Sequence, residues 1–222
     1  MSINTKYMLE LENVSTNNRK FALKNNNLRL ESGYIYCITG ENGSGKTTLL
    51  RQILDENAKY SGVIKLFGED IRGRHNIVMK YAGYVSEERV FLEKRTALQN
   101  AEILGKLYSE FDIDIFKEYM KIMNTSINTT YYKMSRGEKM KFQLSFAIAC
   151  QSKIYILDDV TAGMDSVFRA ELFDMLRGLL SGECLVIITT HNVSEITRHT
   201  DYVAVMENGS LGEFTESIEF GV

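Results

Sequence analysis

The 222-residue sequence has no excess of basic charge, no long apolar run and no proline. Its 26 basic and 29 acidic residues leave a formal net charge of -3, so nucleic-acid binding would require a local basic patch. The longest apolar runs, such as residues 185–188, have the length of a strand and are far too short to span a membrane. We therefore expect a soluble globular chain with no nucleic acid among its partners.

Cysteine is scarce as well. Cys37, Cys150 and Cys184 are an odd number without paired spacing, and each lies in an apolar context. This pattern argues against a disulfide framework or a metal site and predicts buried, reduced thiols in a cytoplasmic protein. The first residues contain no charged segment leading into an apolar core, so we expect no signal peptide.

What the sequence does contain is a phosphate-binding loop of the form G-x-x-x-x-G-K-[ST]. An apolar, strand-like run at residues 34–39 precedes it, and apolar residues at helical spacing follow it. Glycines let successive backbone N–H groups turn toward a phosphate, and the N-terminus of the next helix adds partial positive charge. In this pattern Lys46 meets the β and γ phosphates, while the hydroxyl of Thr47 is a ligand for Mg²⁺. The predicted nucleoside triphosphate site consists of Gly40, Glu41, Asn42, Gly43, Ser44, Gly45, Lys46, Thr47 and Thr48.

Strand and helix patterns alternate along the rest of the chain. Short apolar or alternating runs predict strands at residues 7–14, 28–30, 62–68, 80–85, 153–157, 184–188 and 202–206, with a closing hairpin through 210–214. The Asn-rich segment 13–27 is expected to form a hairpin with its turn near residues 17–18. Helical spacing predicts helices after the phosphate loop, within 94–124, and at 135–150, 166–180 and 193–198. A helical block thus interrupts an α/β nucleotide-binding core.

A second informative stretch is the apolar run that ends in Asp158 and Asp159. A buried parallel strand ending in an acid places that carboxylate at the carboxyl edge of the sheet, beside the phosphate loop. Asp158 is there expected to hold the water shell of Mg²⁺, and Asp159 to orient the attacking water. The alternative is a solvated pair of acids that merely opens a loop.

The order of the phosphate loop, the helical block, Ser135, Asp158, Asp165 and His191 resembles the nucleotide-binding subunit of an ATP-binding cassette (ABC) transporter. The resemblance covers nearly the whole chain. It implies one α/β P-loop NTPase domain over residues 1–222. Residues 1–88 and 152–222 would form the core with an antiparallel β subdomain, and residues 89–151 an inserted α-helical subdomain. It also implies ATP and Mg²⁺ as cofactors.

The resemblance further implies a head-to-tail dimer of ATPase subunits, either a homodimer or a paralogous heterodimer, with two ATP molecules between them. Ser135, Arg136, Gly137 and Glu138 match the family's LSGGQ signature, which offers a helix N-terminus to the ATP of the opposing subunit. Asp165 matches the D-loop that crosses this interface. His191 matches the switch histidine that touches the γ-phosphate, although a histidine after a strand can also be merely structural.

Several positions depart from the family pattern. Asp159 replaces the usual catalytic glutamate and is one methylene shorter, so hydrolysis is expected to be slow. Glu87 stands at the position of the glutamine that senses Mg²⁺ and water. Val160 follows the catalytic acid where a proline is usual. The aromatic residue that stacks on adenine aligns near Asn18, and Phe21 is the nearest substitute, with a core-facing strand residue as the alternative.

Arg136 and Glu138 are variants that resemble bacterial exporters of the ABC-2 type. The predicted function is therefore an ATP-hydrolysing subunit that powers a multi-spanning membrane permease from the cytoplasmic face, exporting peptides or antimicrobial and drug-like compounds. Phe91, Leu92 and Leu98 are candidates for receiving a short helix of that permease. The alternatives are a soluble, non-transport ABC ATPase and an ATP-binding regulatory module with little turnover.

Overall fold

The computed structural model describes residues 6–17, 21–87, 91–160, 164, 166–180, 183–192 and 197–219. Its main sheet has the strand order β10-β9-β3-β8-β7-β6, and β11 also pairs with β9. Four neighbouring strands of this sheet run parallel: β3 (Ile35–Thr39), β8 (Leu185–Thr190), β7 (Ile154–Asp158) and β6 (Ala82–Ser86). Every residue of β3, β7 and β8 is buried, as expected for parallel strands covered on both faces.

β9 (Tyr202–Glu207) extends the sheet beyond β3 and is parallel to it. Two short strands, β10 (Ser210–Leu211) and β11 (Thr215–Glu216), pair antiparallel with different parts of β9. The expected closing hairpin is therefore shorter than residues 210–214, because the chain leaves β10 after two residues and returns as β11.

A second, antiparallel sheet has the order β2-β1-β4-β5. Its strands are β1 (Leu9–Ser15), β2 (Asn26–Leu30), β4 (Ser61–Leu66) and β5 (Glu69–Asp70). Buried and exposed residues alternate along β2, because one face of this sheet packs inward and the other meets solvent. The pairing of Val14 with Asn26 confirms the hairpin expected within residues 13–27, whose turn lies partly outside the described residues.

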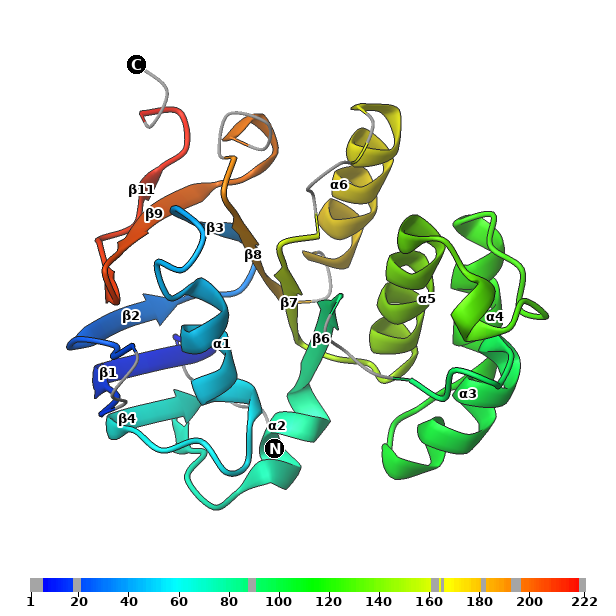
Figure 1. The fold of residues 1–222 in the computed structure, drawn as a ribbon, viewed down its shortest axis with the longest axis horizontal. Helices are drawn as coiled ribbons and strands as arrows, with labels where there is room; N and C mark the ends of the chain where they lie inside the picture. The colour runs from blue at the N-terminus through cyan, green and yellow to red at the C-terminus, as the bar shows by residue number, and fades with distance from the viewer. Residues whose placement is uncertain are drawn as a thin grey trace.

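Helix α1 (Lys46–Leu54) lies between the two sheets (Figure 1). Leu49, Leu50 and Ile53 share one core with residues of both sheets, so burial on two sides holds the start of this helix in place. Helix α6 (Ser166–Leu180) covers the opposite face of the parallel sheet, where Leu172 and Phe173 join a second core. The helix predicted at residues 166–180 is thus confirmed.

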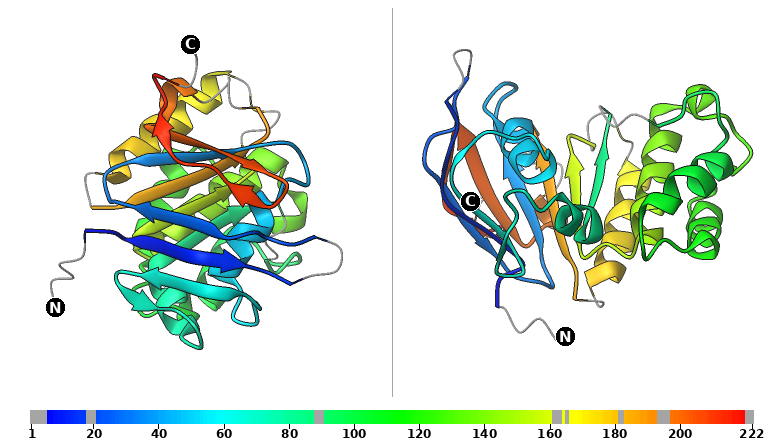
Figure 2. Two further views of the ribbon diagram at one scale, coloured as in Figure 1. Left: turned by 90° about the vertical axis from the view of Figure 1, so that its left-hand side faces the viewer. Right: turned by 90° about the horizontal axis from the view of Figure 1, so that it is seen from below.

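The helical block contains α3 (Ala97–Leu104), α4 (Ile113–Ile122) and α5 (Arg136–Ala149), together with the 3-10 turns η1 (Gly105–Leu107) and η2 (Tyr131–Lys133). An aromatic core joins these elements, with Phe116, Phe142 and Phe146 each at most 1% exposed. α5 also contributes Leu144 to the core beneath the parallel sheet, so this helix attaches the block to the sheet. Both views in Figure 2 and Figure 1 place the block beyond β6 and β7, away from α1.

Two sequence-based predictions of the fold were wrong. The strand predicted at residues 80–85 begins only at Ala82, because α2 (His75–Tyr81) continues until Ala82 N–H closes its last bond to Val78. The helices predicted within 94–124, by contrast, are confirmed as α3 and α4, and Asp112 caps the start of α4. Phe91 is 4% exposed and packs edge-on against Phe142, so it belongs to the core and is not available to a partner.

Two further features complete the fold. The short helix expected at residues 193–198 lies mostly outside the described residues. Its last two residues are described and belong to the 3-10 turn η4 (Thr197–His199). Within the described part of the chain, no helix combines the length and the apolar character needed to cross a bilayer. Cys37, Cys150 and Cys184 are free and buried, as predicted.

Candidate nucleotide-binding site

The carboxyl ends of four parallel strands meet at one edge of the main sheet. The register pairs Thr39 with Thr190, Asp158 with Thr189, and Ser86 with Asp158. The phosphate loop leaves β3 at this edge, and the residues that follow β8, β7 and β6 leave beside it. The strand order therefore brings together segments that are far apart along the chain. Along the sheet their spatial order is the phosphate loop, His191, Asp159 and Glu87.

Two glycines of the phosphate loop are required by the close approach of other segments. Gly40 has φ +151°, and a Cβ there would collide with the backbone carbonyl of Met206 on β9. Gly45 has φ +118°, and a Cβ there would lie 2.8 Å from the ring of Phe21. A side chain at either position would force the loop off β9 or away from Phe21. The ring of Phe21 thus lies against the loop, on the segment where the adenine-stacking residue was expected.

Two polar groups inside the loop fit a phosphate. The hydroxyl of Ser44 is buried and has no hydrogen-bond partner among the described residues. Lys46 is 7% exposed, and its Nζ donates to the carbonyl oxygens of Gly40 at 2.6 Å and Glu41 at 3.0 Å. An unpaired buried hydroxyl is costly unless a ligand supplies the partner. An oxyanion cradled by this loop would accept bonds from Ser44 and Lys46 at once.

The charge of Lys46 is balanced from the neighbouring strand ends. Burial lowers the pKa of Lys46, while the carboxylates of Asp159 and Asp158 act in the opposite direction. The ammonium group of Lys46 and the two acids are therefore close enough to influence one another across β8. Such a placement is expected if the ammonium group of Lys46 balances the negative charge of both the bound phosphates and the two carboxylates.

Asp158 is 6% exposed and is held from both sides by hydroxyl groups. Thr189 Oγ1 on β8 donates to Asp158 Oδ1 at 2.5 Å, and the Tyr84 hydroxyl on β6 donates to Oδ2 at 3.3 Å. The hydroxyl of Thr47 and the carboxylate of Asp158 are hard oxygen donors that fit Mg²⁺. No cluster of three or more potential metal-ligating side chains occurs among the described residues.

Asp159 and His191 form an acid and base pair at the surface of this edge. His191 Nδ1 lies 3.1 Å from Asp159 Oδ1, and the two side chains are 41% and 44% exposed. Asp159 has φ +51°, in the left-handed region, and its backbone N–H donates to Thr189 Oγ1 at 2.9 Å. The carboxylate is thus fixed at its backbone and at one oxygen while remaining accessible to water.

Glu87 and the signature residue Arg136 form an ion pair within this chain. Arg136 Nη2 also approaches the carbonyl oxygen of Asp159 at 3.5 Å. Glu87, just after β6, and Arg136, at the start of α5, both depart from the family pattern, and their opposite charges pair with each other. The pairing connects the helical block to the same sheet edge that carries the acids.

The remaining signature residues cap α5. Ser135 Oγ accepts from the backbone N–H of Glu138 at 3.3 Å, and Glu138 Oε2 accepts from the backbone N–H of Ser135 at 2.8 Å. This reciprocal capping box explains why the helix begins at Arg136. The bond from the Ser135 N–H holds the pKa of Glu138 below its ordinary value. A Cβ on Gly137 would meet nothing within 4 Å, so the described part of the chain leaves open space there.

Three residues at the site were not predicted from the sequence, and one predicted residue lies outside the described part. Tyr84, Thr189 and Met206 contact Asp158 or the phosphate loop. Only Thr189 carried a signal, since it occurs two residues before His191 at the end of a strand. Asp165 lies outside the described residues, so the structure says nothing of the expected D-loop contact.

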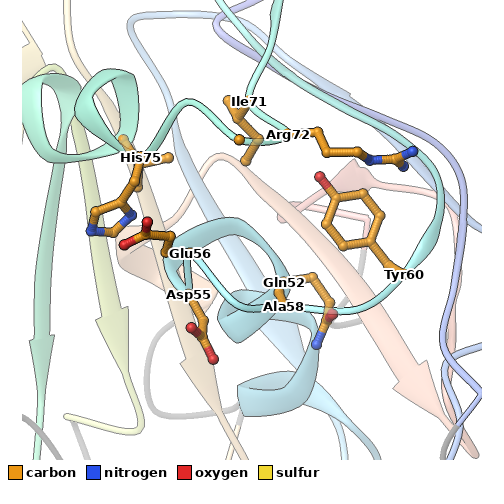
Figure 3. A pocket seen from close by; sticks show the side chains of 10 residues that line it. Gln52, Asp55, Glu56, Ala58, Tyr60, Ile71, Arg72 and His75 are labelled. Carbon is orange, nitrogen blue, oxygen red and sulfur yellow. The ribbon is translucent and has the colours of Figure 1, made fainter.

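A separate small pocket lies at the opposite end of α1 from the phosphate loop (Figure 3). Figure 3 shows His75 and Glu56 on one side of it and Tyr60 and Arg72 on the other. Its volume of about 30 Å³ is of the order of one water molecule and far too small for a nucleotide. None of the predicted site residues is among its lining residues, so this pocket is not the nucleotide site.

A phosphate loop after β3, a buried acid at the end of β7 and a helical block beside an antiparallel sheet define a nucleotide-binding P-loop protein of the cassette type. A sequence profile of the family described as ABC transporter matches residues 23–162. The chain belongs to this family, as the order of its motifs predicted. ATP hydrolysis by this chain stays a prediction and is taken up below.

Two curated relatives are bacterial ATP-binding proteins. The chain is 30% identical over 190 residues to the ABC transporter ATP-binding protein YtrB of Bacillus subtilis, covering 85% of this chain and 65% of YtrB. It is 28% identical over 190 residues to the bacitracin transport ATP-binding protein BcrA of Bacillus licheniformis, covering 84% of this chain and 62% of BcrA. The chain thus spans somewhat less than two thirds of the length of these relatives.

The fold is also found among solved structures. A dimeric ATP-binding cassette, MJ0796, in a post-hydrolysis state bound to ADP and Pi superposes with a TM-score of 0.81 at 21% identity, covering 95% of this chain and 99% of that one. The α/β core with an antiparallel β subdomain and an inserted helical subdomain is thereby confirmed.

Proposed function

We propose that this chain binds ATP with Mg²⁺, hydrolyses it, and powers a membrane exporter of peptides or antimicrobial and drug-like compounds. The observation that carries the proposal is the convergence of the phosphate loop, Asp158, Asp159 and His191 at one sheet edge. A simple solvated acid pair would not explain the buried and doubly hydrogen-bonded carboxylate of Asp158.

Each residue of this edge has a distinct task in the proposed reaction. The loop N–H groups, Ser44 and Lys46 bind the β and γ phosphates, and Thr47 and Asp158 would hold the cation. Mg²⁺, when bound, supplies positive charge to the phosphate oxygens in the transition state. Asp159 accepts a hydrogen bond from the attacking water, whose oxygen bonds to the γ-phosphorus as the bond to the ADP oxygen breaks. His191 holds the Asp159 carboxylate in position.

The signature residues are proposed to act on the ATP of a second subunit. Arg136 contacts Asp159 and Glu87, which lie farther along the sheet edge from the phosphate loop than His191 does. Helices α5 and α1 lie on opposite sides of β6 and β7 (Figure 1). A head-to-tail second copy, or a paralogue, would supply the missing half of each site. The open space at Gly137 agrees with close approach of another molecule.

Coupling to a permease is proposed to run through the segment after Glu87. Leu92, Ile103 and Leu107 are 40%, 44% and 66% exposed and belong to the helical block or its entrance. These apolar side chains replace the buried Phe91 as candidates for contact with a cytoplasmic helix of the membrane partner. Attachment to such a partner would place this chain at the cytoplasmic face of the membrane.

The class of cargo rests on similarity. BcrA is named for bacitracin transport, which supports an antimicrobial compound as cargo. Export as the direction rests on the resemblance of Arg136 and Glu138 to exporters of the ABC-2 type. The cargo itself would be recognised by the membrane subunit.

The competing proposal is an ATP-binding module with little turnover. It is favoured by the short side chain of Asp159 and by the ion pair that occupies Glu87. The other alternative, a soluble non-transport ATPase, would share the whole nucleotide site, and no feature of the described residues favours it.

Single-turnover hydrolysis separates the first two proposals. The purified chain is mixed with limiting γ-labelled ATP, with and without Mg²⁺, and Lys46→Ala serves as the control that loses phosphate binding. Mg²⁺-dependent release of phosphate by the wild type alone is the expected result. Tight ATP binding without release would support the low-turnover module instead.

Co-purification tests the transport half of the proposal. A tagged copy is isolated from its own cell in a gentle detergent, and its partners are identified. A stoichiometric multi-spanning membrane protein is expected. Recovery only with soluble assemblies would contradict the exporter and leave the nucleotide chemistry standing.

A further inference from the structure

Thr189 is a buried hydroxyl that links the two acids of the site. The residue is fully buried at the end of β8, opposite Asp158 in the parallel register. Its Oγ1 donates to Asp158 Oδ1 at 2.5 Å and accepts from the backbone N–H of Asp159 at 2.9 Å. A hydroxyl has one proton and two lone pairs, so Thr189 donates its hydrogen bond to the carboxylate of Asp158 and uses a lone pair on the backbone N–H of Asp159.

The two hydrogen bonds restrain different things. The bond to Asp158 restrains the rotation of a side chain whose other oxygen is bonded to Tyr84. The bond from Asp159 restrains a backbone with φ +51°, a conformation that a non-glycine residue adopts only when its surroundings hold it there. Because one oxygen atom makes both bonds, the orientation of Asp158 and the backbone of Asp159 are set together.

His191 extends the same linkage. It follows Thr189 by two residues on the same chain segment, and its Nδ1 lies 3.1 Å from Asp159 Oδ1. The end of β8 therefore holds Asp159 at its backbone through Thr189 and at its carboxylate through His191. A shift of this strand end would therefore move both Asp158, which is proposed to hold the cation, and Asp159, which is proposed to orient the water.

We propose that Thr189 is a positioning residue that couples cation binding by Asp158 to water activation by Asp159. The inference rests on the proposed ATP hydrolysis and goes beyond the roles implied by the family resemblance. Removal of the hydroxyl leaves the N–H of Asp159 without its acceptor and deprives Asp158 of its shorter hydrogen bond. Cation affinity and ATP turnover should then fall together.

The experiment compares Thr189→Val, which keeps the volume and removes the hydroxyl, with Thr189→Ser, which keeps the hydroxyl. The matched control is Thr200→Val, because Thr200 is also a buried threonine and its hydroxyl bonds to Ser217 at 2.9 Å, away from the site. Binding of a fluorescent, non-hydrolysable ATP analogue is measured with and without Mg²⁺, and ATP turnover is measured as a function of Mg²⁺ concentration.

Thr189→Val is expected to bind the analogue normally without Mg²⁺. Its Mg²⁺ requirement should rise, and its turnover at saturating Mg²⁺ should fall, each by about 10- to 100-fold, the range typical of residues that orient metal ligands. Thr189→Ser should restore both to within about threefold, and Thr200→Val should match the wild type.

Wild-type Mg²⁺ dependence and turnover in Thr189→Val would overturn the proposal, and so would a Thr189→Ser variant as impaired as Thr189→Val. If Thr189→Val does not fold, Thr189→Cys replaces it, because a thiol is a weak donor and acceptor and should give the same two losses. A wild-type chain that binds the analogue with Mg²⁺ but never releases phosphate would contradict the proposed hydrolysis. In that case the Mg²⁺-dependent binding still decides whether Thr189 positions Asp158.

Discussion

At the scale of single residues, Asp159 has the most demanding task in the proposed reaction. Its φ of +51° lies in the left-handed region, where aspartate and asparagine are tolerated better than most other side chains. The short acid therefore suits the backbone that Thr189 and His191 hold, even though the family usually has a longer one there. The side chain is about half exposed, so water can reach it.

We expect Asp159→Asn to lower single-turnover hydrolysis by at least about 100-fold with little change in ATP affinity, because the amide keeps the shape but loses the basic oxygen. Phosphate release and equilibrium binding of ATP are the two measurements. Asn192→Ala, at an exposed neighbouring position, is the control for a general disturbance of this edge. Unchanged hydrolysis in Asp159→Asn would show that another group orients the water.

The residues that the sequence alone revealed are those with a local pattern. The phosphate loop and Asp158 stand in short motifs flanked by the expected strand and helix, so each could be found without knowing the fold. The pairing of Glu87 with Arg136 and the contacts of Tyr84 and Thr189 depend on the strand order β3-β8-β7-β6. No local spacing determines that order, and these contacts were therefore not foreseen.

At the scale of elements, the start of α5 has one observed task, in stability, and one proposed task, in function. Ser135 and Glu138 satisfy each other's backbone N–H groups, which is a stabilising task that needs no ligand. The same helix N-terminus is the proposed contact for the opposing ATP. Substitutions here can separate the two tasks.

Ser135→Ala should lower the free energy of unfolding by about 1 kcal/mol, the usual effect of losing a capping hydroxyl.

The contribution of Glu138 to the free energy of unfolding should depend on pH. Because the folded-state pKa of Glu138 is lowered, its stabilisation is present above the unfolded value of 4.5 and is lost as the pH falls through the folded value. Chemical denaturation of the wild type and Glu138→Ala between pH 3 and about pH 7 checks this. A stability difference that persists at the lowest pH would contradict it.

Gly137→Ala should have opposite effects on stability and function. Alanine is favoured over glycine within a helix by about 1 kcal/mol, and the added Cβ meets nothing within 4 Å in this chain. The variant should therefore be at least as stable as the wild type in denaturant. Turnover should nevertheless fall about 10-fold or more if another subunit's nucleotide approaches this position. Gly178→Ala in α6, where a Cβ also meets nothing within 4 Å, is the matched control. Equal turnover in both variants would argue against a close contact at Gly137.

The helices and strands were predicted best where a segment is well buried and the spacing of its apolar residues indicates the same type of element. The fully buried β3, β7 and β8 and the long α6 were recognised near their observed bounds. The short α2 was not, because a seven-residue helix leading directly into a strand has too few turns to show a period.

At the scale of the whole molecule, one sheet edge carries the residues proposed to act on the nucleotide, and α1 and α5 lie on opposite sides of β6 and β7 (Figure 1). The arrangement leaves each chain with one phosphate-binding face and one signature face. Among the described residues, Arg136 is bonded to Glu87 and Asp159 and not to the phosphate loop, so the two faces do not close on each other there. Association of two copies is the proposed way to complete both sites.

We expect ATP to convert Asp159→Asn from monomer to dimer, because slowed hydrolysis preserves the ATP that would lie between the subunits. Size-exclusion chromatography with light scattering, run with ATP and Mg²⁺, measures the molar mass directly. Adding Lys46→Ala should abolish the dimer through lost phosphate binding, whereas adding Gly137→Ala should weaken it while leaving ATP binding intact. A variant that binds ATP tightly and remains monomeric would exclude the homodimer and direct the search to a paralogous subunit, because the signature face would still need a nucleotide that its own chain cannot present.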